Sequence, residues 1–74
     1  MPHVNIKYFP QPLSDEQEAA LVAAVSGAVR DALGCDEGVI SIALEPVAAE
    51  EWDGLVYGPE IVGRKHLLRK TPNY

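Results

Sequence analysis

The chain has 74 residues with a formal net charge of −5, of which 47% are hydrophobic and 23% charged, and it contains one cysteine. This composition is typical of one globular domain spanning residues 1–74, and the single Cys35 excludes an intramolecular disulfide. A domain of about 60 residues buries only about 60% of its unfolded surface. We therefore expect a chain that is unusually compact or that shares its core with a partner.

The distribution of charge and apolar residues disfavours several classes of protein. All 11 acidic residues lie within the first 60 residues, beside only Lys7 and Arg30, whereas residues 61–74 hold four cations and no acid. Such an acidic body argues against nucleic acid as the main partner. No apolar run is long enough to cross a membrane and no secretory signal is visible, which favours a cytoplasmic protein. His3 and His66 are too far apart for structural-zinc spacing, so no metal is expected.

The first predicted element is a strand over residues 3–9. Val4, Ile6 and Tyr8 alternate with polar residues, as in a strand with one buried face. Pro10 follows, and proline supplies no hydrogen-bond donor to a sheet. The strand should therefore end there.

A long helix is predicted next. Ser14 and Gln17 have the spacing of a capping box, and apolar residues recur with helical period as far as Leu33. Gly34 then occupies the position that favours a left-handed cap. The pattern predicts one helix of about 19 residues, roughly 28 Å long.

The rest of the chain is predicted to hold a second strand and short helical pieces. Residues 39–45 alternate between apolar and small or polar side chains, which predicts a strand. One short helical turn is predicted within residues 47–57. Pro59 fits the first position of a second short helix that ends near Lys70, although Gly63 disfavours it.

This order of elements predicts a single β-α-β unit of the α/β (α+β) class with parallel strands and a short C-terminal helix. A lone two-stranded parallel sheet leaves an edge open, whereas parallel sheets are normally covered on both faces. We therefore expect the sheets of two or more copies to join across an oligomer interface.

The sequence has no Gly-rich phosphate loop, no Ser–His–Asp signature and no metal-ligand pair at helical spacing. The N-terminus is the remaining candidate for chemistry. Removal of Met1 would leave Pro2 with a free secondary amine. Such an amine can act as general base and then general acid if its pKa falls toward the working pH.

The sequence resembles the 4-oxalocrotonate tautomerase family, most closely its dimeric PptA-like bacterial subgroup. The similarity covers nearly the whole chain. It is carried by Met1-Pro2-His3-x-x-Ile6-Lys7-x-Phe9-Pro10, Ile40-Ser41-Ile42-Ala43-Leu44, Trp52, Pro59-Glu60-Ile61 and Lys70-x-Pro72-x-Tyr74.

The resemblance implies a fold in which two protomers form a four-stranded sheet with the helices on one side. It also implies a cofactor-independent tautomerase, an isomerase that interconverts enol and keto forms of a small acid such as phenylenolpyruvate. The base would be Pro2 after loss of Met1. Trp52 lies where the family places a pocket aromatic that keeps the proline amine in an apolar setting.

Two arginines that hold the substrate in the best-known members have no counterpart here. One would fall near Gln11–Leu13 and the other at Ser41, and neither region is basic. We treat Leu13, Ser41, Trp52 and His3 as the candidate pocket residues. The group that stabilises the enolate stays open among Lys7, His3, Arg64 and backbone N–H groups near Ser41.

A second hypothesis is a non-catalytic dimeric binding module on the same scaffold, favoured by the missing arginines. A third is a promiscuous amine site that also performs hydration or dehalogenation. The sequence does not separate this third hypothesis from the tautomerase.

Overall fold

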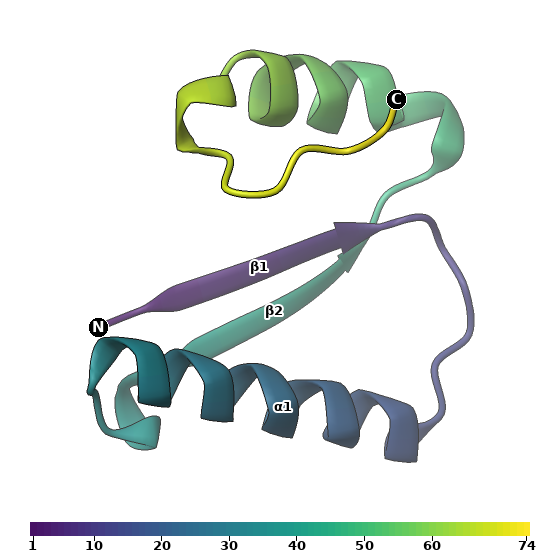
Figure 1. Cartoon of the computed structure of the whole chain (residues 1–74). Coiled ribbons are helices and arrows are strands. Elements are labelled where there is room, and N and C mark those ends of the chain that lie inside the picture. The colour runs from purple at the N-terminus through teal and green to yellow at the C-terminus, as the bar shows by residue number, and fades with distance from the viewer.

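The computed structural model describes all 74 residues, Met1–Tyr74. Two parallel strands, β1 (His3–Tyr8) and β2 (Ser41–Pro46), are connected by the helix α1 (Asp15–Leu33). Helix α1 lies along one side of the two strands, and the segment after β2 lies on the other (Figure 1). The predicted β-α-β unit is therefore confirmed. None of the helices is long and apolar enough to cross a lipid bilayer.

Helix α1 begins and ends where the capping residues predict. The Gln17 amide donates to Ser14 Oγ at 3.0 Å, and the Ser14 amide donates to Gln17 Oε1 at 2.9 Å. Gly34 adopts a left-handed conformation with φ 65°, and its N–H donates to the Arg30 carbonyl. A residue with a Cβ is disfavoured in this conformation, which explains glycine here.

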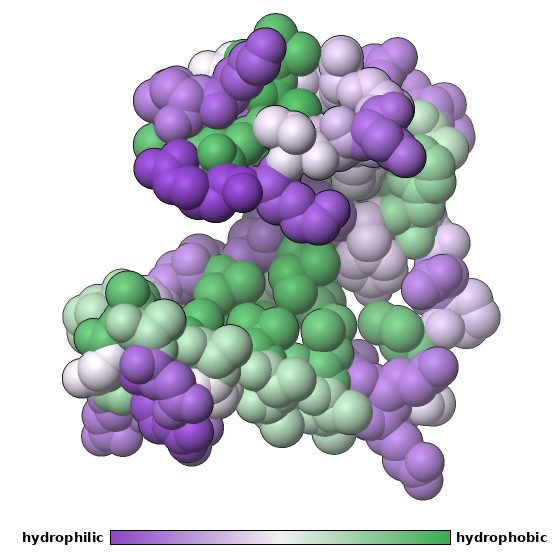
Figure 2. Space-filling view, viewed as in Figure 1, coloured by the Kyte–Doolittle hydropathy of each residue, from purple (hydrophilic) through white to green (hydrophobic).

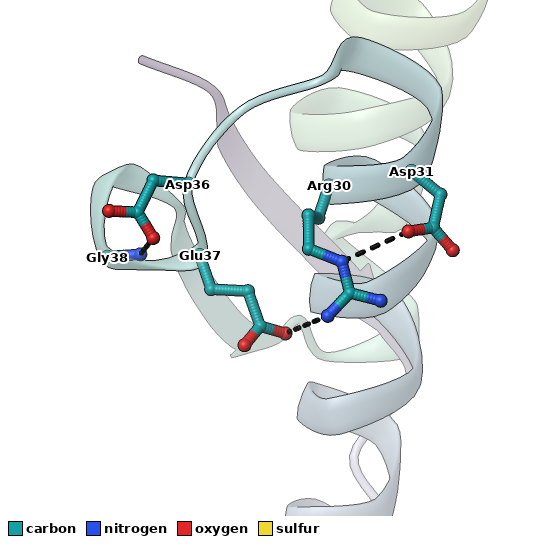
Figure 3. A network of polar contacts seen from close by, with 5 residues as sticks. All are labelled: Arg30, Asp31, Asp36, Glu37 and Gly38. Atoms are coloured by element: carbon teal, nitrogen blue, oxygen red, sulfur yellow. Dashed lines mark hydrogen bonds and ion pairs between the residues drawn. The ribbon is translucent and has the colours of Figure 1, made fainter.

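A surface network of charged side chains holds the connection from α1 to β2 (Figure 3). Arg30 donates to Asp31 at 3.0 Å and pairs with Glu37 at 3.3 Å. The hydrogen bond to Asp31 and the charges of both carboxylates raise the pKa of Arg30 above its ordinary value. The arginine therefore stays charged and joins the end of α1 to the following turn.

That turn makes the second strand start later than predicted. Glu37–Val39 forms a 3₁₀ turn, η1, in which Asp36 Oδ1 accepts a hydrogen bond from the Gly38 amide at 3.3 Å. The alternation that predicts a strand from Val39 is overridden by this local side-chain cap. Strand β2 begins at Ser41, and His3 pairs with Ser41 at the start of the sheet.

The predicted helix starting at Pro59 is wrong. After the 3₁₀ turn η2 (Ala49–Glu51), a π-helix, η3 (Asp53–Val62), runs with Pro59 in its interior. The Gly63 amide donates to the Gly58 carbonyl, five residues back, at 2.8 Å. One further 3₁₀ turn, η4 (Lys65–Leu67), precedes the tail.

Burial is scarce and lies outside the regular elements. Only Val47 and Val56 are buried, each 5% exposed, and no residue of α1 is. Leu33, at the end of the predicted apolar stripe of α1, is 66% exposed. Hydrophobic side chains remain visible between the α1 layer and the C-terminal segment (Figure 2).

The size of the surface agrees with this sparse burial. The accessible surface is 5626 Å² for 8.0 kDa, whereas a folded monomer of this mass exposes about 4,500 Å². The Cα radius of gyration is 13.9 Å, against about 11 Å for a compact chain of this length. The isolated protomer thus carries roughly 1,100 Å² more surface than a self-contained domain.

Candidate active site

The N-terminal ends of the two strands bring together Pro2, His3 and Ser41, which we call the proline end. His3 and Ser41 are partners in the parallel register, and the Ser41 amide donates to the Pro2 carbonyl at 3.2 Å. The His3 Nδ1 and Ser41 Oγ atoms lie 2.6 Å apart in a hydrogen bond. The sheet therefore holds Pro2 by its backbone and places a bonded imidazole–hydroxyl pair beside it.

The first two residues differ sharply in their surroundings. Pro2 is half-buried, whereas Met1 is fully exposed. Met1 therefore contributes no packing to the fold. Its removal would free the Pro2 amine without disturbing the strand that carries it.

The polar face of the sheet continues from the proline end toward the C-terminal segment. Asn5 donates to Glu45 Oε1 at 3.0 Å, a diagonal contact between neighbouring strands. Lys7 follows on the same face, half-buried and without an ion pair. The Asn5–Glu45 contact was not anticipated, because alternation assigns a face to each residue but not the register between strands.

Aromatic residues gather at the opposite end of the strands, and we call Phe9, Trp52 and Tyr74 the aromatic end. The Phe9 and Trp52 rings meet edge to face with centroids 5.0 Å apart, and Trp52 Nε1 donates to the Tyr74 hydroxyl at 3.3 Å. With Asp53 these side chains line a cavity of 420 Å³. Its size is suited to a small organic molecule.

A second cavity, of 340 Å³, adjoins the aromatic end and extends over the polar face of the sheet. Its lining is Asn5, Lys7, Trp52, Val56, Glu60, Ile61 and Leu68. Glu60 is already paired with Arg64 at 3.4 Å. Lys7 is thus the only cation that lines this cavity, and it has no counter-ion there.

The five candidate site residues fall into two groups within one protomer. Pro2, His3 and Ser41 meet at the proline end, whereas Trp52 and Leu13 follow the C-terminal ends of β2 and β1. Five register steps separate the two ends, a distance of about 17 Å. Neither cavity lined by Trp52 includes Pro2 or Leu13, although one of them extends along the sheet as far as Asn5. No group of three His, Cys, Asp or Glu side chains comes together as a metal site would require.

Comparison with known proteins identifies the family. The family model described as "Tautomerase enzyme" matches residues 2–61. Relatives named Tautomerase PptA align with all 74 residues of this chain and 97% of their own length. They are 35% identical in Cronobacter sakazakii, 38% in an Enterobacter species and 36% in Escherichia coli O139:H28. The family match begins at the proline and runs through both strands, so the chain belongs to the tautomerase family.

Proposed function

We propose that this protein is a cofactor-independent tautomerase that ketonises small enol acids such as phenylenolpyruvate, with Pro2 as the proton-transferring group once Met1 is removed. The observation that carries the proposal is the placement of Pro2. It is half-buried, its carbonyl is fixed by the Ser41 amide, and the residue before it is fully exposed.

The chemistry follows from a free amine at this position. The neutral Pro2 nitrogen takes the proton of the enol hydroxyl, and the resulting ammonium returns a proton to the neighbouring carbon. One O–H bond breaks and one C–H bond forms, while the C=C bond becomes a C–C single bond and the C–O bond becomes C=O. No electrons are gained or lost overall, so no cofactor or oxidant is needed. General acid–base catalysis of this kind contributes about 10²–10⁴-fold in rate.

We propose further that the active form is a homodimer and that the pocket is shared. The excess surface of the protomer, roughly 1,100 Å², exceeds the about 800 Å² that each partner buries in a standard interface. A two-fold axis perpendicular to the sheet would pair open edges antiparallel and place α1 of both copies on one side. The aromatic end of one copy would then lie beside the proline end of the other.

The test of the base is the ketonisation rate of phenylenolpyruvate on untagged protein whose mass confirms loss of Met1. We expect Pro2→Ala to lower kcat by about 100-fold or more, and a tag on the amine to do the same. Pro10→Ala, in the exposed loop after β1, is the matched control and should retain full rate. A wild-type rate no higher than buffer would instead favour the non-catalytic binding module.

The shared pocket is tested by mixing two inactive variants. Pro2→Ala and Trp52→Leu protomers, refolded together, form heterodimers in half of the population, and each heterodimer has one intact site if the pocket is shared. About one quarter of wild-type activity should return. No recovery, despite heterodimers detected by mass spectrometry, would place Trp52 outside the site that contains Pro2.

A further inference from the structure

Tautomerisation leaves negative charge on an oxygen, and the group that stabilises it must lie at the proline end. A preorganised donor at a developing oxyanion is worth about 10²–10³-fold in rate. Each of the three arginines of this chain is already engaged. Arg30 pairs with Asp31 and Glu37, and Arg64 pairs with Glu60. Arg69 donates to the carbonyls of His66 and Leu68.

The remaining donors near Pro2 can be compared one by one. The Ser41 amide already donates to the Pro2 carbonyl. Lys7 stands four residues beyond His3 on the same strand, about 13 Å away. His3 is adjacent to Pro2 and its Nε2 atom makes no hydrogen bond within the chain. Within one protomer its imidazole is therefore the one uncommitted side-chain donor at this end. In the proposed dimer Lys7 of the second copy, which lines a cavity with Trp52, is the rival donor.

The bond to Ser41 indicates which ring nitrogen carries the proton. An N–H group normally approaches oxygen no closer than about 2.7 Å, whereas a hydroxyl donor makes contacts of about 2.5–3.0 Å. The 2.6 Å separation of Nδ1 and Oγ thus fits a bond in which the Ser41 hydroxyl donates to Nδ1. A neutral imidazole that accepts at Nδ1 must carry its proton at Nε2.

We propose that His3 is the oxyanion donor of this tautomerase, through Nε2–H, and that Ser41 is a positioning residue that fixes its tautomer and orientation. This inference rests on the proposed function. Pro2 moves the proton between oxygen and carbon, while His3 donates a hydrogen bond to the oxygen in between and loses no proton. The pair thereby takes the place of the missing arginine at the enolate oxygen.

The test combines kinetics on four variants with the wild type at saturating phenylenolpyruvate. His3→Leu should lower kcat by about 10²–10³-fold with little change in KM, because the bond forms only as charge develops. His3→Gln, which keeps an N–H donor near the same place, should lie within about tenfold of wild type. Ser41→Ala should cost about tenfold, and Ser41→Thr, which keeps the hydroxyl, should restore the rate.

A spectroscopic measurement tests the tautomer without relying on activity. The ¹⁵N shifts of the imidazole nitrogens at pH 8, where imidazoles are ordinarily neutral, should show the proton of His3 on Nε2. The His3→Gln spectrum assigns the signal against that of His66. In Ser41→Ala the preference should weaken, a change that a purely structural role of Ser41 would not produce.

Several results would overturn the inference. One is a proton on Nδ1 in the wild type, and another is a His3→Gln dimer as slow as His3→Leu. A third such result is a large loss of kcat in Lys7→Met together with a kcat within threefold of wild type in His3→Leu. If the His3 variants keep the wild-type rate while Pro2→Ala abolishes it, the donor role fails and the tautomerase stands. If Pro2→Ala keeps the wild-type rate, the proposed function itself fails.

Discussion

Residues 1–46 and residues 47–74 are built in opposite ways. The first region has all the regular structure, with a capped 19-residue helix and a six-residue parallel ladder, yet it contains no buried residue. The second is a succession of 3₁₀ and π turns, yet it holds Val47 and Val56, the two buried side chains. Hydrogen bonding within the chain thus defines the first region, whereas apolar packing defines the second.

This contrast explains why the two regions have different relations to a partner. The two-stranded sheet has open edges and α1 is poorly covered, and the proposed dimer would complete their burial. The C-terminal segment packs against the sheet of its own protomer and forms cavities there. In the proposed dimer, the first region supplies Pro2 and the second supplies Trp52.

The largest effect should come from adding a side chain at Gly63, the residue that caps the C-terminal end of the π-helix. A Cβ at Gly63 would lie 2.8 Å from the Pro59 carbonyl oxygen and 3.2 Å from that of Gly58, and both neighbours are backbone. Gly63→Ala should therefore cost about 3 kcal/mol in the free energy of unfolding, measured by urea denaturation.

Gly54 is the matched control for this substitution. It lies in the same π-helix, and a Cβ there meets nothing within 4 Å. Gly54→Ala should be neutral or slightly stabilising, because alanine loses less backbone entropy on folding. Equal costs at the two positions would show that close packing does not sustain the π-helix.

The sequence predicted the first region well because its signals are local. Ser14, Gln17 and Gly34 act within one turn of the helix ends, and the alternation around Val4 and Ile6 assigns the faces of β1. The start of β2 was missed because the Asp36 cap and the Arg30–Glu37 pair involve side chains whose geometry depends on where α1 ends.

The π-helix was missed because helix rules assume bonds four residues apart. Gly58 and Pro59 look like breakers on that basis, since proline clashes with the carbonyl four residues earlier in an α-helix. The glycines at positions 58 and 63 are five residues apart, which is the hydrogen-bond spacing of a π-helix. A Cβ at Gly58 would lie 3.1 Å from the Asp53 carbonyl oxygen, also five residues back. That spacing was the available signal.

The sequence names the five candidate residues, but it does not show how they group in space. Pro2, His3 and Ser41 meet because β2 starts at Ser41, a register that alternation alone does not supply. Trp52 and Leu13 are candidates because of the family resemblance, and a resemblance does not say which protomer contributes each residue. The two ends of the strands are about 17 Å apart, the length of about five strand residues. Whether one protomer or two form the site therefore depends on the oligomer.

A smaller effect should distinguish how the two regions are packed. Val56→Ala removes a buried side chain of the C-terminal segment and should cost about 2 kcal/mol, from lost apolar burial and the cavity left behind. Val29→Ala makes the same change on α1, where the side chain is only half-buried, and alanine has the higher helix propensity. Its cost should stay below about 1 kcal/mol at a concentration low enough for the protomer to be monomeric, and it should rise where the proposed dimer covers α1. Urea unfolding at two protein concentrations measures the cost of both substitutions. If Val29→Ala costs more than Val56→Ala, and its cost grows with protein concentration, a partner buries α1 more tightly than the chain buries its own C-terminal core.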